Sequence, residues 1–228
     1  MIYLVTGGSG SGKSAYAESL LSGFEHVHNR YYIATMQVYG EEGKKRVERH
    51  RRLRAGKGFL TVEQTVQIGD ALKKFWTEES NEGAKEKTTL QNRTQNTSAA
   101  LVECVSNLTA NEMFDENGQR GEQEVANRVV SGLKQLSKFV QELVIVTNNV
   151  FDDGISYDES TMSYIRALAR INIELAKWAD EVTEVTAGIP VIWKMKNNKK
   201  MGNEIACERN SEKTVRTIEQ IRKEKLDG

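Results

Sequence analysis

The segment Gly7–Ser14 reads GGSGSGKS and matches the pattern G-x-x-x-x-G-K-[ST]. In a loop of this kind the glycines let backbone N–H groups turn inward toward phosphate oxygens, and the helix that follows adds its positive N-terminal end. A lysine at the Lys13 position reaches the β- and γ-phosphates, and a hydroxyl at the Ser14 position holds Mg²⁺. The pattern therefore predicts a site for a nucleoside triphosphate, with Lys13 catalytic, formed by Gly7, Gly8, Ser9, Gly10, Ser11, Gly12, Lys13 and Ser14.

A loop that binds a triphosphate with Mg²⁺ is usually accompanied by a carboxylate at the end of a second buried strand. Glu103 closes the apolar run Ala99–Glu103 (AALVE) and is the best-placed candidate, while Asp152 and Asp153 are weaker ones. The alternative interpretation of Glu103 is a surface glutamate at a strand end. We predict that Ser14 and Glu103 together hold Mg²⁺.

His50 lies in a basic run, RVERHRRLR, that extends from Arg46 to Arg54. The arginines can hold phosphate oxygens in bidentate fashion, and they lower the pKa of an imidazole among them. A neutral imidazole in that setting can act as a nucleophile toward phosphorus. The same arginines could instead only steer the nucleotide, and spacing does not decide between the two. His26 and His28 lack such neighbours and are expected to be solvated.

Alternating apolar and amphipathic segments must position these residues. Buried-strand character is found at 1–6, 31–34, 60–63, 99–103, 143–147, 181–186 and 189–194, and helical character at 13–22, 41–54, 66–76, 104–114, 122–142 and 161–179. Ala187-Gly188 joins the last two strands so tightly that they must be antiparallel. The alternation predicts a three-layer α/β fold of the P-loop (RecA-like) kind, with a mostly parallel sheet and an antiparallel C-terminal edge hairpin. The site is expected at the carboxyl ends of the strands.

The length of 228 residues suits a single domain, which we place at 1–196, with a polar loop insert at 78–97 and a charged C-terminal extension at 197–228. Lys plus Arg and Asp plus Glu each number 32, so no global basic field points to nucleic acid. No apolar stretch approaches the ~20 residues of a membrane span. Cys104 and Cys207 lie far apart and outside any metal-ligand pattern, as expected of a reduced cytoplasmic protein.

Several segments occur together in an order that is more specific than the P-loop alone. They read MIYLVTGGSGSGKSAYAE, YYIATMQ, RVERHRR, TVE, LVECVSNL, VIVTNNV and ARINIELAKWADEVTEVTAGIPVIWK. This set resembles the bifunctional adenosylcobinamide kinase / adenosylcobinamide-phosphate guanylyltransferase family of cobalamin biosynthesis. The resemblance covers about Met1–Lys194, apart from the polar insert.

The resemblance implies two reactions on one chain. A nucleoside triphosphate, ATP or GTP, phosphorylates adenosylcobinamide, and GTP then donates GMP to adenosylcobinamide phosphate through a GMP-histidine intermediate at the position of His50. A homotrimer is implied as well. Besides the P-loop, the nucleotide contacts that the resemblance implies are Ala34, Thr35, Met36, Arg51, Arg52, Leu53, Arg54, Glu63 and Glu103.

The chain departs from the family pattern at several places outside the P-loop. Ala55 stands where the family has proline, Asn149 where it has a carboxylate, and Ile165 where it has arginine. We therefore expect nucleotide binding to be intact, while acceptor binding or one of the two reactions is altered. The alternatives are a relative with a single activity, kinase or guanylyltransferase, and a P-loop nucleotide-binding or regulatory protein without cobinamide chemistry.

Overall fold

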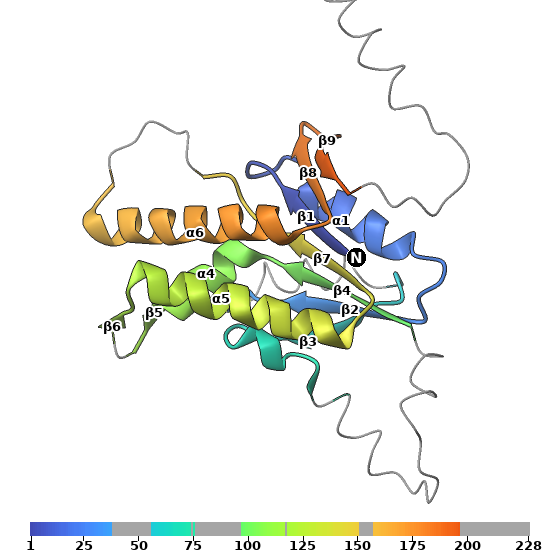
Figure 1. The fold of residues 1–228 in the computed structure, drawn as a ribbon, viewed down its shortest axis with the longest axis horizontal. Coiled ribbons are helices and arrows are strands. Elements are labelled where there is room, and N and C mark those ends of the chain that lie inside the picture. The colour runs from blue at the N-terminus through green and yellow to red at the C-terminus, as the bar shows by residue number, and fades with distance from the viewer. Residues whose placement is uncertain (38–55, 74, 76–96, 117, 151–156, 197–228) are drawn as a thin grey trace, which may run out of the picture. The chain divides into compact units, whose positions relative to one another are not determined.

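The computed structural model describes residues 1–37, 56–73, 75, 97–116, 118–150 and 157–196 (Figure 1). The chain divides into two units, Met1–Met195 and Lys196–Gly228, and the fold described below is that of the first. Three predictions lie outside the described residues: the helix at 41–54, the polar insert at 78–97 except Thr97, and the charged extension at 197–228.

Among the described residues, seven strands form one sheet in the order β3-β2-β4-β7-β1-β8-β9. Neighbouring strands from β3 through β8 are parallel, and only the last pair, β8 with β9, is antiparallel. The predicted mostly parallel sheet with an antiparallel C-terminal edge hairpin is therefore confirmed. The strands are β1 (Ile2–Thr6), β2 (Asn29–Ala34), β3 (Leu60–Glu63), β4 (Ser98–Glu103), β7 (Glu142–Val146), β8 (Glu181–Thr186) and β9 (Ile189–Met195).

Helices cover both faces of this sheet, which gives the three layers (Figure 1). On one face lies α1 (Lys13–Ser22), which packs on Tyr3 and Val5 of β1. On the other face lie α4 (Val105–Met113), α5 (Glu122–Leu136) and α6 (Glu159–Trp178), in one core cluster with Leu4. Residues 3, 4 and 5 alternate between the two cores because successive strand side chains point to opposite faces.

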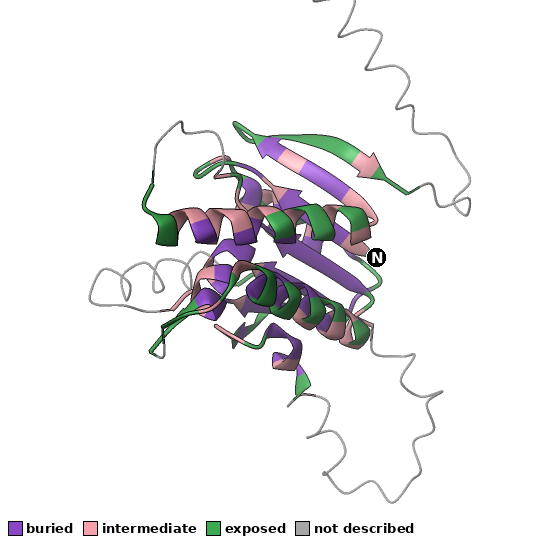
Figure 2. Cartoon of the chain, turned by 60° about the vertical axis from the view of Figure 1, so that its left-hand side comes forward, coloured by how far each residue is buried: buried purple, intermediate pink, exposed green. Residues whose placement is uncertain are grey.

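The central strands β4 and β7 are apolar between their terminal polar residues, because helices cover both of their sides. Every residue of β7 is buried, and in β4 only Glu103 is partly exposed. The helices show apolar stripes instead, with Val125, Val129 and Leu133 spaced four residues apart along α5. Figure 2 shows the result: buried strands at the centre, helices exposed on their outer sides, and a largely exposed β9 at the edge.

Three regions differ from the sequence prediction by more than two residues or in the kind of element. The region 66–76 begins with a short 3-10 helix, η1 (Ile68–Asp70), because Gln67 takes a left-handed conformation, φ 50°, that interrupts α-helix geometry. The helix predicted at 122–142 ends at Leu136, followed by the 3-10 helix η3 (Ser137–Phe139), since Glu142 already pairs with Ala99 in the sheet. The region after α4 holds a small antiparallel hairpin, β5 (Phe114–Asp115) with β6 (Gly118–Gln119).

In the part of the chain that the structure describes, no helix combines the length and the apolar character needed to cross a membrane.

The 3-10 helix η1 lies unusually close to α5, and two glycines make this approach possible. A Cβ on Gly132 would lie 2.8 Å from Cγ2 of Ile68 and 3.3 Å from the backbone nitrogen of Gly69. A Cβ on Gly69 would lie 2.9 Å from Oε1 of Gln135. Gly132 therefore lowers the helix propensity of α5, and its missing Cβ allows η1 to pack closely against the helix.

Gly132→Ala should consequently lower the free energy of unfolding by about 1–3 kcal/mol, because the added methyl group overpacks the contact with Ile68. Chemical denaturation measures the change. The control is Ser131→Ala at the neighbouring exposed position of the same helix, which should shift stability by less than about 0.5 kcal/mol. If Gly132→Ala is instead stabilising, as helix propensity alone predicts, the packing argument is wrong.

Candidate nucleotide-binding site

The P-loop connects β1 directly to α1, as the sequence predicts. Gly12 adopts the left-handed conformation, φ 93°, just before the helix, and its carbonyl accepts the N–H of Tyr16 at 3.0 Å. Within the loop the N–H of Ser11 donates to the carbonyl of Gly8 at 3.2 Å. The first turn of α1 therefore opens immediately beside the loop, where its unpaired N–H groups favour an anion.

Two of the loop glycines are required by their surroundings. A Cβ on Gly7 would lie 2.5 Å from the carbonyl oxygen of Val185, a distance that no real side chain tolerates. A Cβ on Gly12 would lie 3.3 Å from Cα of Gly188, in addition to the unfavourable φ. The end of β8 thus presses against the loop at both of its ends.

Hydrogen bonds from the neighbouring strand ends hold the loop from two sides. The N–H of Gly188, in the β8–β9 turn, donates to the carbonyl of Ser11 at 2.8 Å. The N–H of Asn149, just after β7, donates to the carbonyl of Gly7 at 3.1 Å. This contact uses the backbone of Asn149, so the support of the loop does not depend on its side chain.

Lys13 is turned into the loop and is only 7% exposed. Its Nζ donates to the carbonyl of Gly8 at 3.0 Å, so the ammonium lies across the hollow of the loop. An ammonium carries three donors, and a bond to Gly8 leaves capacity for phosphate oxygens. Burial of this charge beside the loop favours a compensating anion there.

The structure brings Ser14 and Glu103 together, although 89 residues separate them in sequence. Oγ of Ser14 donates to Oε1 of Glu103 at 2.9 Å. A hydroxyl and a carboxylate beside a phosphate-binding loop are the oxygen donors that Mg²⁺ uses, and the remaining positions around Mg²⁺ are usually filled by water and phosphates. No cluster of three or more His, Cys, Asp or Glu side chains suited to a metal occurs in the described ranges. The Ser14–Glu103 pair therefore fits the predicted metal.

Further predicted contact residues line up along the carboxyl edge of the sheet. Ala34 at the end of β2 is in register with Glu63 on β3 and with Glu103 on β4. Ala34 and Met36 are half-buried, Glu63 is exposed, and Thr35 is fully buried. The register places these strand ends beside one another on the edge that carries the metal-site pair.

His50, its neighbours Arg51, Arg52, Leu53 and Arg54, and also Ala55, Asp152 and Asp153 lie outside the described residues. The other two histidines are exposed, as predicted. His26 lies 3.3 Å from a carboxylate oxygen of Glu142, and Nδ1 of His28 lies 3.1 Å from Oγ1 of Thr97.

A polar cluster between α4, α6 and the segment that follows β7 was not predicted from the sequence. Nδ2 of Asn148 donates to Oγ of Ser106 at 2.6 Å, and the hydroxyl of Thr147 donates to Oδ1 of Asn172 at 2.7 Å. Nδ2 of Asn172 in turn donates to the carbonyl of Asn148 at 3.3 Å. The sequence does contain a signal for this cluster, because polar residues follow the buried strands β4 and β7 at the carboxyl edge of the sheet, where binding sites form.

Two ionisable side chains beside this cluster stay neutral. Burial, followed by the neighbouring Glu103 carboxylate, raises the pKa of the Cys104 thiol, so the predicted core cysteine remains unreactive. Burial also raises the pKa of Tyr164 to about 12, and its hydroxyl donates to the carbonyl of Ser106 at 3.3 Å. The cluster therefore acts through neutral hydrogen bonds that tie α6 to the strand ends.

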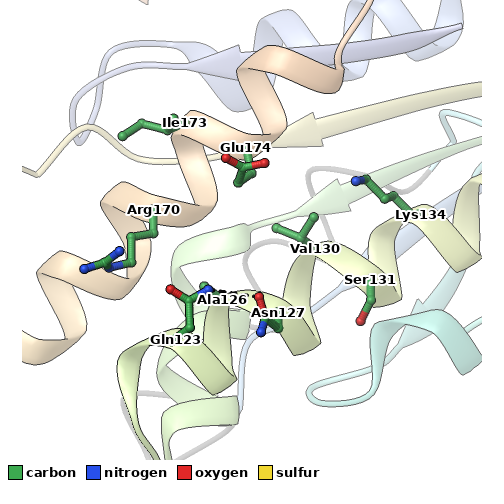
Figure 3. A pocket seen from close by; sticks show the side chains of 9 residues that line it. All are labelled: Gln123, Ala126, Asn127, Val130, Ser131, Lys134, Arg170, Ile173 and Glu174. Atoms are coloured by element: carbon green, nitrogen blue, oxygen red, sulfur yellow. Dashed lines mark hydrogen bonds between the residues drawn. The ribbon is translucent and has the colours of Figure 1, made fainter.

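A groove between α5 and α6 contains none of the predicted nucleotide-binding residues (Figure 3). Its charged side chains already have partners: Glu174 accepts from Lys177 at 2.8 Å, and Arg170 lies 3.8 Å from Glu122. The groove is lined by Gln123, Ala126, Asn127, Val130, Ser131, Lys134, Arg170, Ile173 and Glu174.

Two solved structures align with this chain at TM-scores below 0.5. The ATPase domain of G40P aligns with a TM-score of 0.47 at 12% identity, over 86% of this chain and 78% of that chain. The flagellar accessory protein FlaH from Methanocaldococcus jannaschii aligns with a TM-score of 0.40 at 14% identity, over 85% and 78% respectively.

Sequence comparisons are more specific. A family model described as cobinamide kinase / cobinamide phosphate guanyltransferase matches residues 3–82 and 74–192. The bifunctional adenosylcobalamin biosynthesis protein CobU of Escherichia coli (strain K12) is 30% identical over 201 residues, which cover 84% of this chain and 98% of that protein. The protein of the same name from Salmonella typhimurium (strain LT2) is 28% identical with the same coverage. With most of its length matched and a P-loop at the expected place, the chain belongs to the cobinamide kinase / cobinamide phosphate guanyltransferase family of transferases.

Proposed function

We propose that this transferase carries out both family reactions: it phosphorylates adenosylcobinamide with ATP or GTP, and it transfers GMP from GTP to adenosylcobinamide phosphate. The observation that carries the proposal is the buried Lys13 in a complete P-loop, next to the hydrogen-bonded Ser14–Glu103 pair, in a chain that matches this family. The loop supplies positioning and positive charge, which are the main contributions a protein makes to phosphoryl transfer.

In the kinase step, a hydroxyl oxygen of adenosylcobinamide attacks the γ-phosphorus. The bond from the γ-phosphorus to the bridging oxygen breaks, the nucleoside diphosphate leaves, and the hydroxyl proton is released. Lys13 and the N–H groups of the P-loop and of the first turn of α1 stabilise negative charge on the phosphate oxygens as this happens. Ser14 and Glu103 would hold Mg²⁺, which supplies further positive charge at the phosphates when it is bound.

In the guanylyltransferase step, an imidazole nitrogen of His50 attacks the α-phosphorus of GTP, and pyrophosphate leaves with the electrons of the broken bond. A phosphate oxygen of adenosylcobinamide phosphate then attacks the same phosphorus, and the phosphorus–nitrogen bond breaks to restore His50. Splitting one transfer into two displacements is the usual advantage of a covalent intermediate. Arg51, Arg52 and Arg54 are proposed to stabilise the phosphate charge.

The strand-end residues are proposed to border the nucleotide. Ala34 and Met36 follow or close β2, and Glu63 closes β3, on the same edge as Glu103. Thr35 and Leu53 complete this predicted set. Glu63 is exposed at that edge, and its carboxylate is proposed to accept hydrogen bonds from a nucleotide base or ribose.

A single-activity enzyme is the second candidate, and specific replacements favour it. The family carboxylate and arginine are replaced by Asn149 and Ile165, both on the β7–α6 side of the site. Loss of those charges would affect the acceptor more than the P-loop, which keeps its backbone support from Asn149. A cytoplasmic homotrimer acting on adenosylcobinamide or its phosphate, without nucleic acid, remains our proposal for its setting.

The GMP-histidine intermediate can be tested by labelling. Incubation with α-labelled GTP and Mg²⁺ should give an acid-labile, base-stable protein adduct, because a phosphorus–nitrogen bond to histidine has that stability pattern. His50→Ala should abolish the label, while the exposed His28→Ala should retain it. A wild-type protein that never labels would remove the guanylyltransferase activity from the proposal and leave the kinase.

The kinase step depends on the buried ammonium of the P-loop. Lys13→Ala should lower kcat/KM for phosphorylation of cobinamide at least about 100-fold, because a preorganised charge on the transferred phosphate is lost. Lys73→Ala, which removes a lysine paired with Asp70 on η1, should leave the rate unchanged. If the wild type phosphorylates no cobinamide with either ATP or GTP and also fails to label, a nucleotide-binding role without cobinamide chemistry replaces both candidates.

A further inference from the structure

We propose that Thr35 is a positioning residue that aims the carboxylate of Glu103 at Ser14. Thr35 directly follows β2 and is fully buried. The N–H and the hydroxyl of Thr35 form hydrogen bonds to the backbone of Glu103 and Cys104, and its carbonyl accepts a hydrogen bond from Asn111. The inference rests on the proposed role of Glu103 as a ligand of the nucleotide-bound metal.

Three hydrogen bonds join Thr35 to the turn at the end of β4. Its N–H donates to the carbonyl of Glu103 at 3.0 Å. Its hydroxyl donates to the carbonyl of Cys104 at 2.8 Å and accepts the N–H of Cys104, also at 2.8 Å. One side chain thus satisfies both backbone groups of the residue that follows Glu103.

The position of this contact matters because the β2–β4 ladder ends there. The last register pair of these two strands is Ala34 with Glu103, so Thr35 lies one residue beyond the sheet. Past the ladder, backbone position is no longer determined by neighbouring strands and needs other hydrogen bonds. The direction of the Glu103 side chain follows from the backbone that Thr35 holds, and that side chain accepts from Ser14.

Thr35 is itself anchored from the helix layer. Nδ2 of Asn111 on α4 donates to the carbonyl of Thr35 at 2.8 Å and to the carbonyl of Thr65 at 2.9 Å. The chain beyond β2 and the chain beyond β3 are therefore tied to one amide group. With its N–H, carbonyl and hydroxyl engaged, Thr35 affects a bound nucleotide through Glu103 rather than through its own hydroxyl.

Full-length variants can separate this positioning role from general stability. Thr35→Val keeps the shape but removes the hydroxyl, and Thr35→Ser restores it. Thr109→Val is the matched control, because Thr109 is also fully buried and its hydroxyl donates to a backbone carbonyl, that of Val105, at 2.8 Å within α4. The probe is Mn²⁺ in the presence of a non-hydrolysable GTP analogue, with bound metal measured by electron paramagnetic resonance.

Thr35→Val should weaken Mn²⁺ binding by about 10-fold or more, the range found when a residue that orients a metal ligand is removed. Thr35→Ser should bind within about 3-fold of the wild type, and Thr109→Val should match the wild type even if both valine variants melt at similarly lowered temperatures. Wild-type Mn²⁺ affinity in Thr35→Val would overturn the positioning role. Should that variant be too unstable to purify, Thr35→Ala makes the same comparison with the same two outcomes.

Glu103→Gln distinguishes failure of the inference from failure of the function on which it rests. If Glu103→Gln binds Mn²⁺ like the wild type, the proposed metal role of Glu103 fails. If Glu103→Gln weakens binding and Thr35→Val does not, only the inference fails. When both weaken it, the double variant should bind no more weakly than Glu103→Gln alone, since both changes act on one ligand; additive losses would show that Thr35 acts independently of Glu103.

Discussion

Close contact between the P-loop backbone and the end of β8 is the constraint on which the rest of the site depends. The loop lies so near β8 that a Cβ on Gly7 would overlap the carbonyl of Val185. Hydrogen bonds from Gly188 on one side and Asn149 on the other then hold the loop between β8 and β7. Because β1 lies between these two strands in the sheet, the loop that follows β1 is hydrogen-bonded on both sides to the protein itself.

The parallel sheet supplies the second part of the site. Parallel strands end on one edge, so residues that close different strands meet there whatever their distance in sequence. Glu63, Ala34 and Glu103 stand in register at three adjacent strand ends. Glu103 meets Ser14 because α1, which carries Ser14, packs against β7 and β4. The polar groups of the candidate site therefore come from the edge of the sheet as well as from the P-loop.

The residues at and near the expected departures from the family pattern make different kinds of contact in the structure. Asn149 supports the P-loop through its backbone N–H, which any residue other than proline could provide. Tyr164 on α6 has a hydroxyl that donates to the carbonyl of Ser106 within the polar cluster beside Cys104 and Asn148. Lys13 and Ser14 are held separately from this region, Lys13 by its bond to the carbonyl of Gly8 and Ser14 by its bond to Glu103.

The features that depend on residues close together in the chain could be predicted from the sequence. The P-loop, the bounds of α1, the antiparallel turn at Ala187-Gly188 and the alternation of strands and helices all follow from local backbone preferences and hydrophobic periodicity. The features that join distant segments could be seen only in the folded chain. They are the order of the strands, the Ser14–Glu103 pair, the 3-10 helix packed against Gly132, and the hydrogen bonds of Thr35. The effect of a buried hydroxyl or of a missing Cβ depends on the atoms that pack against it. A local sequence pattern does not specify those atoms, because they come from distant segments.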